Sequence, residues 1–435
     1  MSSKKKVLSL FSGCGGMDLG FEGGFKVHKN CVNKVLHPDW IDDEIGPNWI
    51  RLKENNFTTT FANDIRPGAK AAWVPYFLKR GLTNAEEIFH LGSIVDYVKE
   101  AKETKKLFLK GSADVVTGGF PCQDFSVAGK RQGFSSHKSH TGYILNECDD
   151  PSYENRGMLY IWMREVINLV SPKIFIAENV KGLVSLSNVK EIIENDFRDI
   201  GESGYLVIPA RILKAPEYGI PQSRDRLFFI GLNREKLTSE AIYHLESNSI
   251  ASEYDPYPIV THQYLNGTMA QPKQLSFLES NLIGHVTAGD VLKDLPEPEL
   301  SNDLSHRTYS KARWYGKHCQ GQTEINLDSV GPTIRSEHHG NIEYRRLSQE
   351  HGGRYSEELK KGLKERRLTV RECARLQTFP DDFDFVRQSG QKDPLWNLSG
   401  SEGYKLIGNA VPPFLAYHIA NRLEQLWNIL FKEEG

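Results

Sequence analysis

Short apolar runs that end in a glycine or an acidic residue recur through the first half of the chain. Each run has the length and the β-branched or aromatic content of a buried strand. Residues 158–170, in contrast, place their apolar side chains at helical spacing. Strands that alternate with helices in this way predict an open α/β fold. The expected strands cover 5–11, 58–64, 113–117 and 174–180.

The alternation stops near residue 245. From there to about 365 the apolar runs are short and irregular, and prolines and glycines are frequent. This pattern predicts a smaller mixed domain. A helix is expected near 368–377, and a terminal helix after 404–413 has the composition to pack back on the first domain. We therefore expect one domain of residues 1–244 completed by 396–435, and a second unit of residues 245–395.

Two further stretches, 29–57 and 135–155, lack a readable period. The first holds Pro38, Trp40, Gly46 and Pro47, and the second is polar. Both are predicted to be inserted surface segments without regular structure.

Bulk composition is that of an ordinary globular protein, with 39% hydrophobic and 25% charged residues among 435. No apolar run approaches the ~20 residues that a membrane span needs. The six cysteines are scattered without CxxC pairs, which predicts neither a disulfide framework nor a metal site. A reducing cytoplasm fits this pattern best.

Net charge is −2, but positive charge is concentrated locally. Residues 301–375 contain 15 Lys and Arg against 10 Asp and Glu, an excess of five positive charges. Such an excess is compatible with a surface that faces phosphate groups. A solvated charged face is the alternative interpretation.

Cys122 follows the expected strand 113–117 and stands directly behind Pro121. The proline fixes its own φ and holds Phe120 extended, so the chain cannot run straight into a helix there. A thiol at such a strand-to-loop edge is well placed to act as a nucleophile. A buried structural cysteine is the alternative.

Other candidate groups also lie at strand ends. The glycine-rich turn 12–16 can admit an anionic or nucleotide-like ligand, or can be a tight turn only. Asp64 can hold ribose hydroxyls or cap the helix expected after it, and Glu178 can act in the ligand crevice or as a cap. Arg224 and Arg226 alternate at the start of a strand, so both are expected on one face, as an anion site or as a salt-bridged pair.

These residues belong to blocks that together resemble the DNA (cytosine-5)-methyltransferases that use S-adenosylmethionine. The blocks occur in the family's order and span nearly the whole chain. The resemblance implies a Rossmann-like, S-adenosylmethionine-dependent catalytic domain, with a target recognition domain and hinge at 245–395. The matching blocks are 10–16, 63–64, 119–126, 178–180, 222–226, 371–377 and 408–411.

The resemblance also implies catalytic roles. Cys122 would attack carbon 6 of cytosine and form a covalent intermediate. Glu178 would protonate or hydrogen-bond N3 and the exocyclic amine, and Arg226 would hold O2 with Arg224 in support. The target cytosine would be flipped out of the duplex into this pocket.

Binding residues carry over from the same blocks. Ser93 stands where many family members have aspartate, and Ile65 stands where an aromatic residue is frequent, so adenine would pack on an aliphatic side chain. Base contacts by 331–341 are a hypothesis, with a solvent-facing loop as the alternative. The residues implied for S-adenosylmethionine are Phe11, Gly13, Gly15, Gly16, Asp64, Ile65, Ser93, Ile94, Pro121, Asn409 and Val411, and those expected to contact DNA are Gln123, Ser126, Gln222, Thr333 and Arg335.

The implied partners are double-stranded DNA and, by family habit, a cognate restriction endonuclease, with S-adenosyl-L-homocysteine as product. A monomer without membrane attachment is expected. Two rival functions share these sequence features: a methyltransferase of the same fold that acts on transfer RNA, and a catalytically silent nucleic-acid-binding regulator. The presence of Cys122, Glu178 and Arg226 argues against the second.

Overall fold

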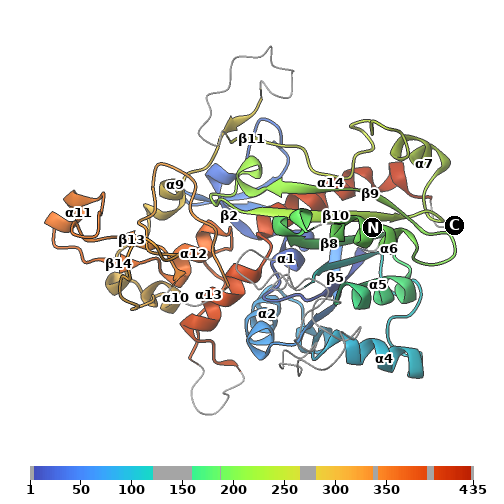
Figure 1. Cartoon of the computed structure of the whole chain (residues 1–435), viewed down its shortest axis with the longest axis horizontal. Coiled ribbons are helices and arrows are strands. Elements are labelled where there is room, and N and C mark those ends of the chain that lie inside the picture. Colours follow the sequence, from blue (N-terminus) through green and yellow to red (C-terminus); the bar gives the residue numbers. More distant parts are fainter. Residues whose placement is uncertain are drawn as a thin grey trace.

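A computed structural model of the chain describes residues 4–120, 159–186, 188–264, 281–336, 341–388 and 396–432. Figure 1 shows a central twisted sheet with helices on both faces, and a group of short elements beside it. Among the described residues, no helix combines the length and the apolar character that crossing a membrane requires.

The central sheet has seven strands in the order β6-β5-β1-β7-β8-β10-β9. The first five in this order run parallel, whereas β10 is antiparallel to both of its neighbours. The chain leaves β1 toward β5 on one side and later returns to β7 on the other, which makes a crevice at their carboxyl ends. The strands are β1 (Lys5–Leu10), β5 (Phe57–Asp64), β6 (Phe89–Leu91), β7 (Val115–Gly119), β8 (Ile174–Val180), β9 (Tyr205–Lys214) and β10 (Asp225–Asn233). The predicted α/β fold class is confirmed.

Each face of the sheet carries its own apolar core. Because side chains alternate along β1, Val7 lies in one core, and Leu8 and Leu10 lie in the other. One core receives α1 (Gly16–Glu22), α2 (Pro67–Lys79) and α14 (Pro413–Leu430); the other receives α4 (Ile94–Thr104), α5 (Leu159–Val170) and α6 (Val189–Arg198). Shorter helices in this part are α3 (Ala85–Ile88), η4 (Lys181–Ser185), η5 (Ala215–Tyr218) and α7 (Ser239–Leu245).

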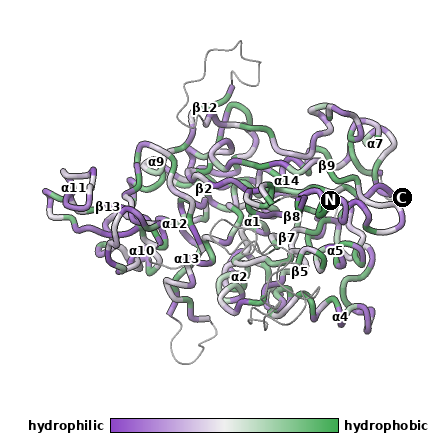
Figure 2. The backbone as a smooth tube through the Cα atoms, viewed as in Figure 1, coloured by the Kyte–Doolittle hydropathy of each residue, from purple (hydrophilic) through white to green (hydrophobic). Residues whose placement is uncertain are grey.

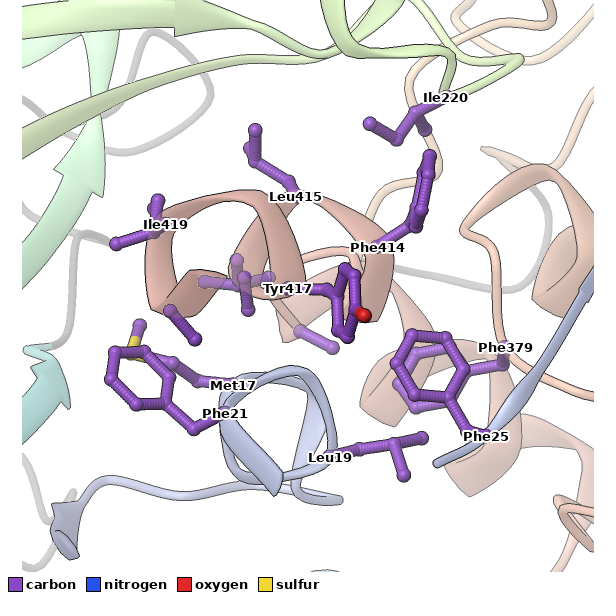
Figure 3. Packing of buried hydrophobic residues seen from close by; sticks show 14 of the residues in the cluster. Met17, Leu19, Phe21, Phe25, Ile220, Phe379, Phe414, Leu415, Tyr417 and Ile419 are labelled. Carbon is purple, nitrogen blue, oxygen red and sulfur yellow. The ribbon is translucent and has the colours of Figure 1, made fainter. Parts of the chain in front are cut away.

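The C-terminal helix α14 packs directly against α1, far from it in sequence. Figure 3 shows Met17 and Phe21 of α1 pointing toward α14. The close approach depends on Gly20, because an added Cβ there would lie 2.4 Å from the Cβ of Ala416. The chain's last helix therefore completes the core beneath the turn that follows β1.

Residues 29–57 contain regular structure where the sequence predicted an irregular insertion, so that prediction is wrong. β2 (Lys26–His28), β4 (Trp49–Leu52) and β3 (Ile41–Ile45) pair as an antiparallel sheet, and η1 (Lys29–Cys31) follows β2. These strands are too short for a period of two to be visible. Trp40 is buried by contact with Tyr417 and His418 of α14, which no local pattern reveals.

The elements after residue 245 are short, as the sequence predicted, and lie at one side of the sheet (Figure 1). Figure 2 shows hydrophilic positions predominating around α11 and β13. The elements are β11 (His262–Gln263), β12 (Ile283–Gly284), α9 (Ala288–Leu292), η6 (Pro298–Leu300), α10 (Leu304–Arg307), β13 (Tyr344–Arg346), α11 (Ser356–Lys360), β14 (Arg366–Arg367), α12 (Val370–Leu376) and α13 (Gly400–Asn409).

Buried arginines stabilise this second region. Arg366 bonds to Glu372 and Glu297, and Arg346 bonds to Glu297 and Glu358. The remaining buried arginines of the region bond to carboxylates or main-chain carbonyls. Five of the ten arginines in 301–375 are no more than 6% exposed: Arg346, Arg366, Arg367, Arg371 and Arg375. Half of the arginine charge that the sequence assigned to a phosphate-facing surface is therefore internal.

Candidate active site

The carboxyl ends of β7 and β8 meet at a glycine and a glutamate. Gly119 is the register partner of Glu178, and an added Cβ at Gly119 would lie 2.9 Å from Glu178 Oε2. Asn179 Nδ2 donates to the carbonyl oxygen of Phe120 at 3.3 Å. The lack of a side chain at Gly119 thus lets the carboxylate lie against the end of β7.

Cys122 follows Phe120 by two residues in the sequence. It lies outside the described residues, as do the other site residues expected in this segment, which are Pro121, Gln123 and Ser126.

Glu178 forms an ion pair with Arg226 of the neighbouring strand. Arg226 Nε lies 2.9 Å from Glu178 Oε1, and the two side chains are only 13% and 10% exposed. The antiparallel register pairs Arg226 with Val180 and Phe228 with Glu178, which puts both charged side chains on one face. η4 is capped by Val180 without a side-chain bond, so Glu178 does not act as its cap.

Burial raises the pKa of Glu178 above its ordinary value, while the positive charges of Arg226 and Arg224 oppose the rise. A carboxyl group in this environment keeps its proton to a higher pH than an exposed glutamate does. It can therefore donate a proton to a ligand in the crevice.

Arg224 has other bonding partners than Arg226. It precedes the first residue of β10, Asp225, so the strand alternation behind the prediction that both arginines point to one face does not extend to it. Its guanidinium is 1% exposed and donates to the carbonyl oxygens of Gly408 and Ala410 at 2.8 Å and of Ile334 at 3.2 Å. Arg224 thus joins the C-terminal segment to residue 334.

Gln222 joins the same parts of the chain. Its fully buried amide nitrogen donates to the Leu376 carbonyl at 3.2 Å and to Gln377, and its oxygen accepts from the Ile334 N–H at 3.1 Å. Both the nitrogen and the oxygen of this amide therefore have hydrogen-bond partners within the protein. The geometry therefore supports a connecting role for Gln222 rather than a contact with DNA.

Thr333 and Arg335 lie on the segment that Gln222 and Arg224 hold. The Thr333 hydroxyl donates to the Ser223 carbonyl, and Arg335 Nη1 lies 2.8 Å from Glu343 Oε1. The Arg335 side chain is 30% exposed. Residues 331–336 are thus fixed beside the strand end that carries Arg226, with part of their surface still open.

The turn after β1 is tied to the end of β5 by a carboxylate. Asp64 accepts from the N–H of Gly13 at 3.0 Å and from the N–H of Arg66 at 2.9 Å, and burial raises its pKa. Arg66, rather than Asp64, is the N-cap residue of α2. Phe11 takes a positive φ of 53°, a strained value for a residue with a side chain.

The three glycines of this turn serve different purposes. An added Cβ at Gly13 would meet nothing within 4 Å, so this residue borders open space. At Gly15 it would lie 2.5 Å from Trp73 Cδ1, and at Gly16 it would lie 2.3 Å from the Val411 carbonyl oxygen. Gly13 leaves room for a ligand beside Asp64, whereas Gly15 and Gly16 permit close packing within the protein. The open space and the carboxylate together fit the ribose portion of S-adenosylmethionine.

The remaining residues expected at this pocket differ in exposure. Ser93 is the N-cap of α4 and accepts from the Val95 N–H, and Ile94 beside it is buried. Ile65 is 40% exposed directly after Asp64, which leaves an aliphatic surface for an adenine ring. At the end of α13, Asn409 is exposed, and Val411 two residues later is buried.

Asp18 is a buried carboxyl group that the sequence analysis missed. It accepts from Trp73 Nε1 at 2.7 Å, beneath the glycine turn, and burial raises its pKa to about 7. A carboxylate among the apolar residues of α1 was the available signal. In the described ranges, no group of three His, Cys, Asp or Glu side chains is arranged to hold a metal ion.

Comparison with known proteins agrees with this geometry. The family model described as C-5 cytosine-specific DNA methylase matches residues 5–425. Type II methyltransferase M.BspRI of Lysinibacillus sphaericus is 31% identical over 438 residues, covering 98% of this chain and 82% of the relative. Type II methyltransferase M.BsuRI of Bacillus subtilis is 28% identical and covers 100% of this chain and 82% of the relative.

Solved structures share the fold at lower identity. The S. pombe Dnmt2 methyltransferase aligns with a TM-score of 0.52 and 19% identity, over 97% of this chain and 99% of that one. The Entamoeba histolytica methyltransferase EhMeth aligns with a TM-score of 0.51 and 14% identity, over 99% and 100%. With the family model covering nearly the whole chain, this protein belongs to the C-5 cytosine-specific DNA methylase family and is a DNA (cytosine-5)-methyltransferase.

Proposed function

We propose that this enzyme transfers the methyl group of S-adenosylmethionine to carbon 5 of one cytosine within a specific site of duplex DNA, as the modification partner of a type II restriction endonuclease. The relatives of highest identity given above are named type II methyltransferases. The observation that carries the proposed chemistry is the buried Glu178–Arg226 pair, which lies against the end of β7 shortly before Cys122 in the sequence.

Carbon 5 of cytosine is a weak nucleophile, so the ring must first be activated. In our proposal the Cys122 thiolate attacks carbon 6 and forms an S–C6 bond. The C5=C6 π electrons move to C4=C5, and the C4=N3 electrons move to N3, where a proton from Glu178 is accepted. Carbon 5 then carries enamine electron density and can take a methyl group.

Arg226 orients both Glu178 and the base in this scheme. Its Nε is engaged by Glu178 and its Nη1 donates to the Asp225 carbonyl at 2.8 Å. The remaining guanidinium N–H groups can donate to the cytosine O2, where negative charge increases during the attack. Arg224 supports the site indirectly, because it holds the segment at Gly408 and Ala410 that closes the site.

S-adenosylmethionine supplies the electrophilic methyl group and leaves as S-adenosyl-L-homocysteine. Asp64 would hold the ribose hydroxyls in the space that Gly13 leaves open. Phe11, Ile65, Ser93 and Ile94 would surround the rest of the adenosine, with Pro121, Asn409 and Val411 closing the pocket. After methyl transfer, Glu178 would take back the N3 proton and solvent water would accept the C5 proton. The C5–H electrons then form C5=C6, and the C6–S electrons leave with the Cys122 sulfur, which restores the aromatic ring.

We assign catalysis to residues 1–244 with 396–435, and target recognition with the hinge to 245–395. Gln123 and Ser126 near the nucleophile, and Thr333 and Arg335 on the segment held by Gln222, are proposed to contact a DNA from which the cytosine has been flipped. A monomeric enzyme in the cytoplasm completes the proposal.

The test is methyl transfer by the purified protein, with radiolabelled S-adenosylmethionine and either duplex DNA or transfer RNA. We expect label in the DNA only, and bisulfite sequencing of the product should place 5-methylcytosine at one position of one short sequence. Label in transfer RNA alone would contradict the DNA assignment. Label in neither substrate would favour the silent binding protein.

A further inference from the structure

A strip of cations lies exposed on the region beside the sheet. Arg307, Lys311, Arg313 and Lys317 are all exposed, and none of these four forms an ion pair with a described residue. The sequence contains no aspartate or glutamate between Asp303 and Glu324. The positive charge of this strip is therefore not neutralised locally.

The strip contrasts with the rest of the positive charge in the region. Arg346 of β13 and the arginines of β14 and α12 are buried and bonded inside the protein. On α11, Lys360 pairs with Glu357 at 2.7 Å. Arg354, Lys361 and Lys364 are exposed as well, but the strip brings four such cations together within eleven residues, with Lys311 over the Tyr309 ring.

A buried arginine holds the strip in shape. Arg367 donates to the carbonyl oxygens of Ala312 and Arg313 at 3.0 Å each and of Gly321 at 2.8 Å, and to the Gln322 side chain at 3.2 Å. Its guanidinium also lies 4.2 Å from the centre of the Tyr344 ring.

Trp314 also holds residues 307–317 in place. Its Nε1 donates to the Gln322 carbonyl at 3.1 Å, and its ring stacks on His351 at 4.2 Å between centroids. Ala312 and Trp314 are half-buried, whereas Lys311, Arg313 and Lys317 are exposed, and Tyr315 among them is 67% exposed.

We propose that the exposed face of residues 307–317 binds the phosphate backbone of the DNA substrate. The inference rests on the proposed function, since it needs duplex DNA as the partner. Unpaired Lys and Arg side chains on a fixed scaffold displace the counterions of a polyanion, which raises affinity without reading bases. This surface would set how tightly DNA binds, whereas residues 331–336 would contribute to the choice of sequence.

The test compares two triple variants that each remove three positive charges from the same region. One is Lys311→Gln with Arg313→Gln and Lys317→Gln; the control is Lys360→Gln with Lys361→Gln and Lys364→Gln, which removes the same charge at and just after α11, where Lys360 pairs with Glu357. The KM for duplex DNA is measured against salt concentration, together with kcat and the methylated sequence.

For the strip variant we expect the slope of log affinity against log salt to become shallower, by about 0.9 for each phosphate group that the protein no longer neutralises. The KM for DNA should rise more than kcat falls, the methylated sequence should stay the same, and the control should behave as wild type. Arg313→Lys, which keeps the charge, should retain the wild-type slope. If the triple variant does not fold, Lys311→Gln and Lys317→Gln singly should each produce part of the change.

A strip variant with wild-type slope and KM would overturn the proposal, as would an equal change in the control, which would indicate a net-charge effect. A changed methylated sequence would assign the strip to base contacts instead. These results remain distinct from failure of the proposed function, in which the wild-type protein would methylate no duplex DNA.

Discussion

Two sets of arginines in this protein have opposite roles. At the edge of the parallel sheet, Arg226 meets Glu178 at a strand end that opens on the crevice. In the region beside the sheet, Arg366 and its neighbours are enclosed by carboxylates and carbonyl groups. Long strands satisfy their own backbone groups and leave charged side chains for chemistry. The loops around the strands of two or three residues leave carbonyls unpaired, and buried guanidinium groups bond to them instead, as Arg367 does to Gly321.

The largest effect should come from the pair at the sheet edge. Glu178→Gln keeps the size of the side chain but removes the proton donor, so kcat should fall by about 10²- to 10⁴-fold while the melting temperature stays near wild type. Steady-state methylation kinetics and thermal unfolding measure the two quantities. If the variant instead loses both its fold and its activity, Glu178 is structural. The arginines at the sheet and those in the region beside it would then both serve stability.

Replacing a buried arginine of the region beside the sheet should instead lower stability. Arg366→Met leaves the Glu372 carboxylate buried without its partner, so the free energy of unfolding should fall by about 3–5 kcal/mol. Urea unfolding measures the loss, and adding Glu372→Gln should recover part of it. As the matched control, Lys360→Met removes a partner of the exposed Glu357 and should cost less than about 1 kcal/mol. Equal losses in the two variants would contradict the distinction.

The glycine turn offers a finer division within the first region. Gly15→Ala would press a methyl group on Trp73 at a φ of +85°, so stability should fall by about 3 kcal/mol. Gly13→Ala meets no atom and should cost about 1 kcal/mol of stability, yet raise the KM for S-adenosylmethionine, because the methyl group enters the ligand space. Urea unfolding measures the stability of each variant, and titration with S-adenosylmethionine measures the KM of each. An unchanged KM in Gly13→Ala would remove that residue from the pocket.

The smallest expected effect is a pH dependence from buried histidines where α14 meets residues 37–40. Burial lowers the pKa of His37 and of His262 to about 4, and the pKa of His418 is shifted in the same direction, chiefly by burial. The unfolded chain takes up protons near pH 6.5, whereas the folded chain does not, so stability is full above pH 6.5 and is lost as pH falls toward 4. Each of His37 and His262 should account for about 1 kcal/mol at pH 5.5.

Unfolding free energies measured between pH 7.5 and 5 test this dependence. His418→Phe, which preserves an aromatic ring among aromatic neighbours, should flatten the curve. The exposed His318 provides a control whose replacement by glutamine should leave the curve unchanged. A curve that His418→Phe leaves as steep as before would exclude His418 as a source of the pH dependence.

The sheet was predictable because its apolar strands end in acids and glycines, and these ends carry Asp64 and Glu178. The small sheet at 26–52 was not predictable, because strands of three to five residues show no period and Trp40 is buried by a helix almost 380 residues later. Local patterns cannot report contacts of such separation.

The local excess of positive charge left two interpretations open for a different reason. A local excess of Lys and Arg indicates a surface only if the side chains reach solvent, and sequence alone gave no sign that Arg346, Arg366 and Arg367 are enclosed. The face of Arg224 could not be derived from sequence for a similar reason, because the two-residue spacing from Arg226 implies a shared face only where both residues lie in the strand. The partners of these arginines are far away in sequence, so only the folded chain identifies them.

The central claim is that Cys122 attacks a cytosine that Glu178 activates, and a duplex with 5-fluorocytosine at the target position tests it most directly. Fluorine cannot leave carbon 5 as a proton does, so with S-adenosylmethionine present the enzyme should remain covalently bound to the DNA after denaturation. We predict this adduct for the wild type, none for Cys122→Ser, and slow formation for Glu178→Gln. An adduct that persists in Cys122→Ser, or its absence from a wild-type enzyme that methylates the unmodified duplex, would contradict the account.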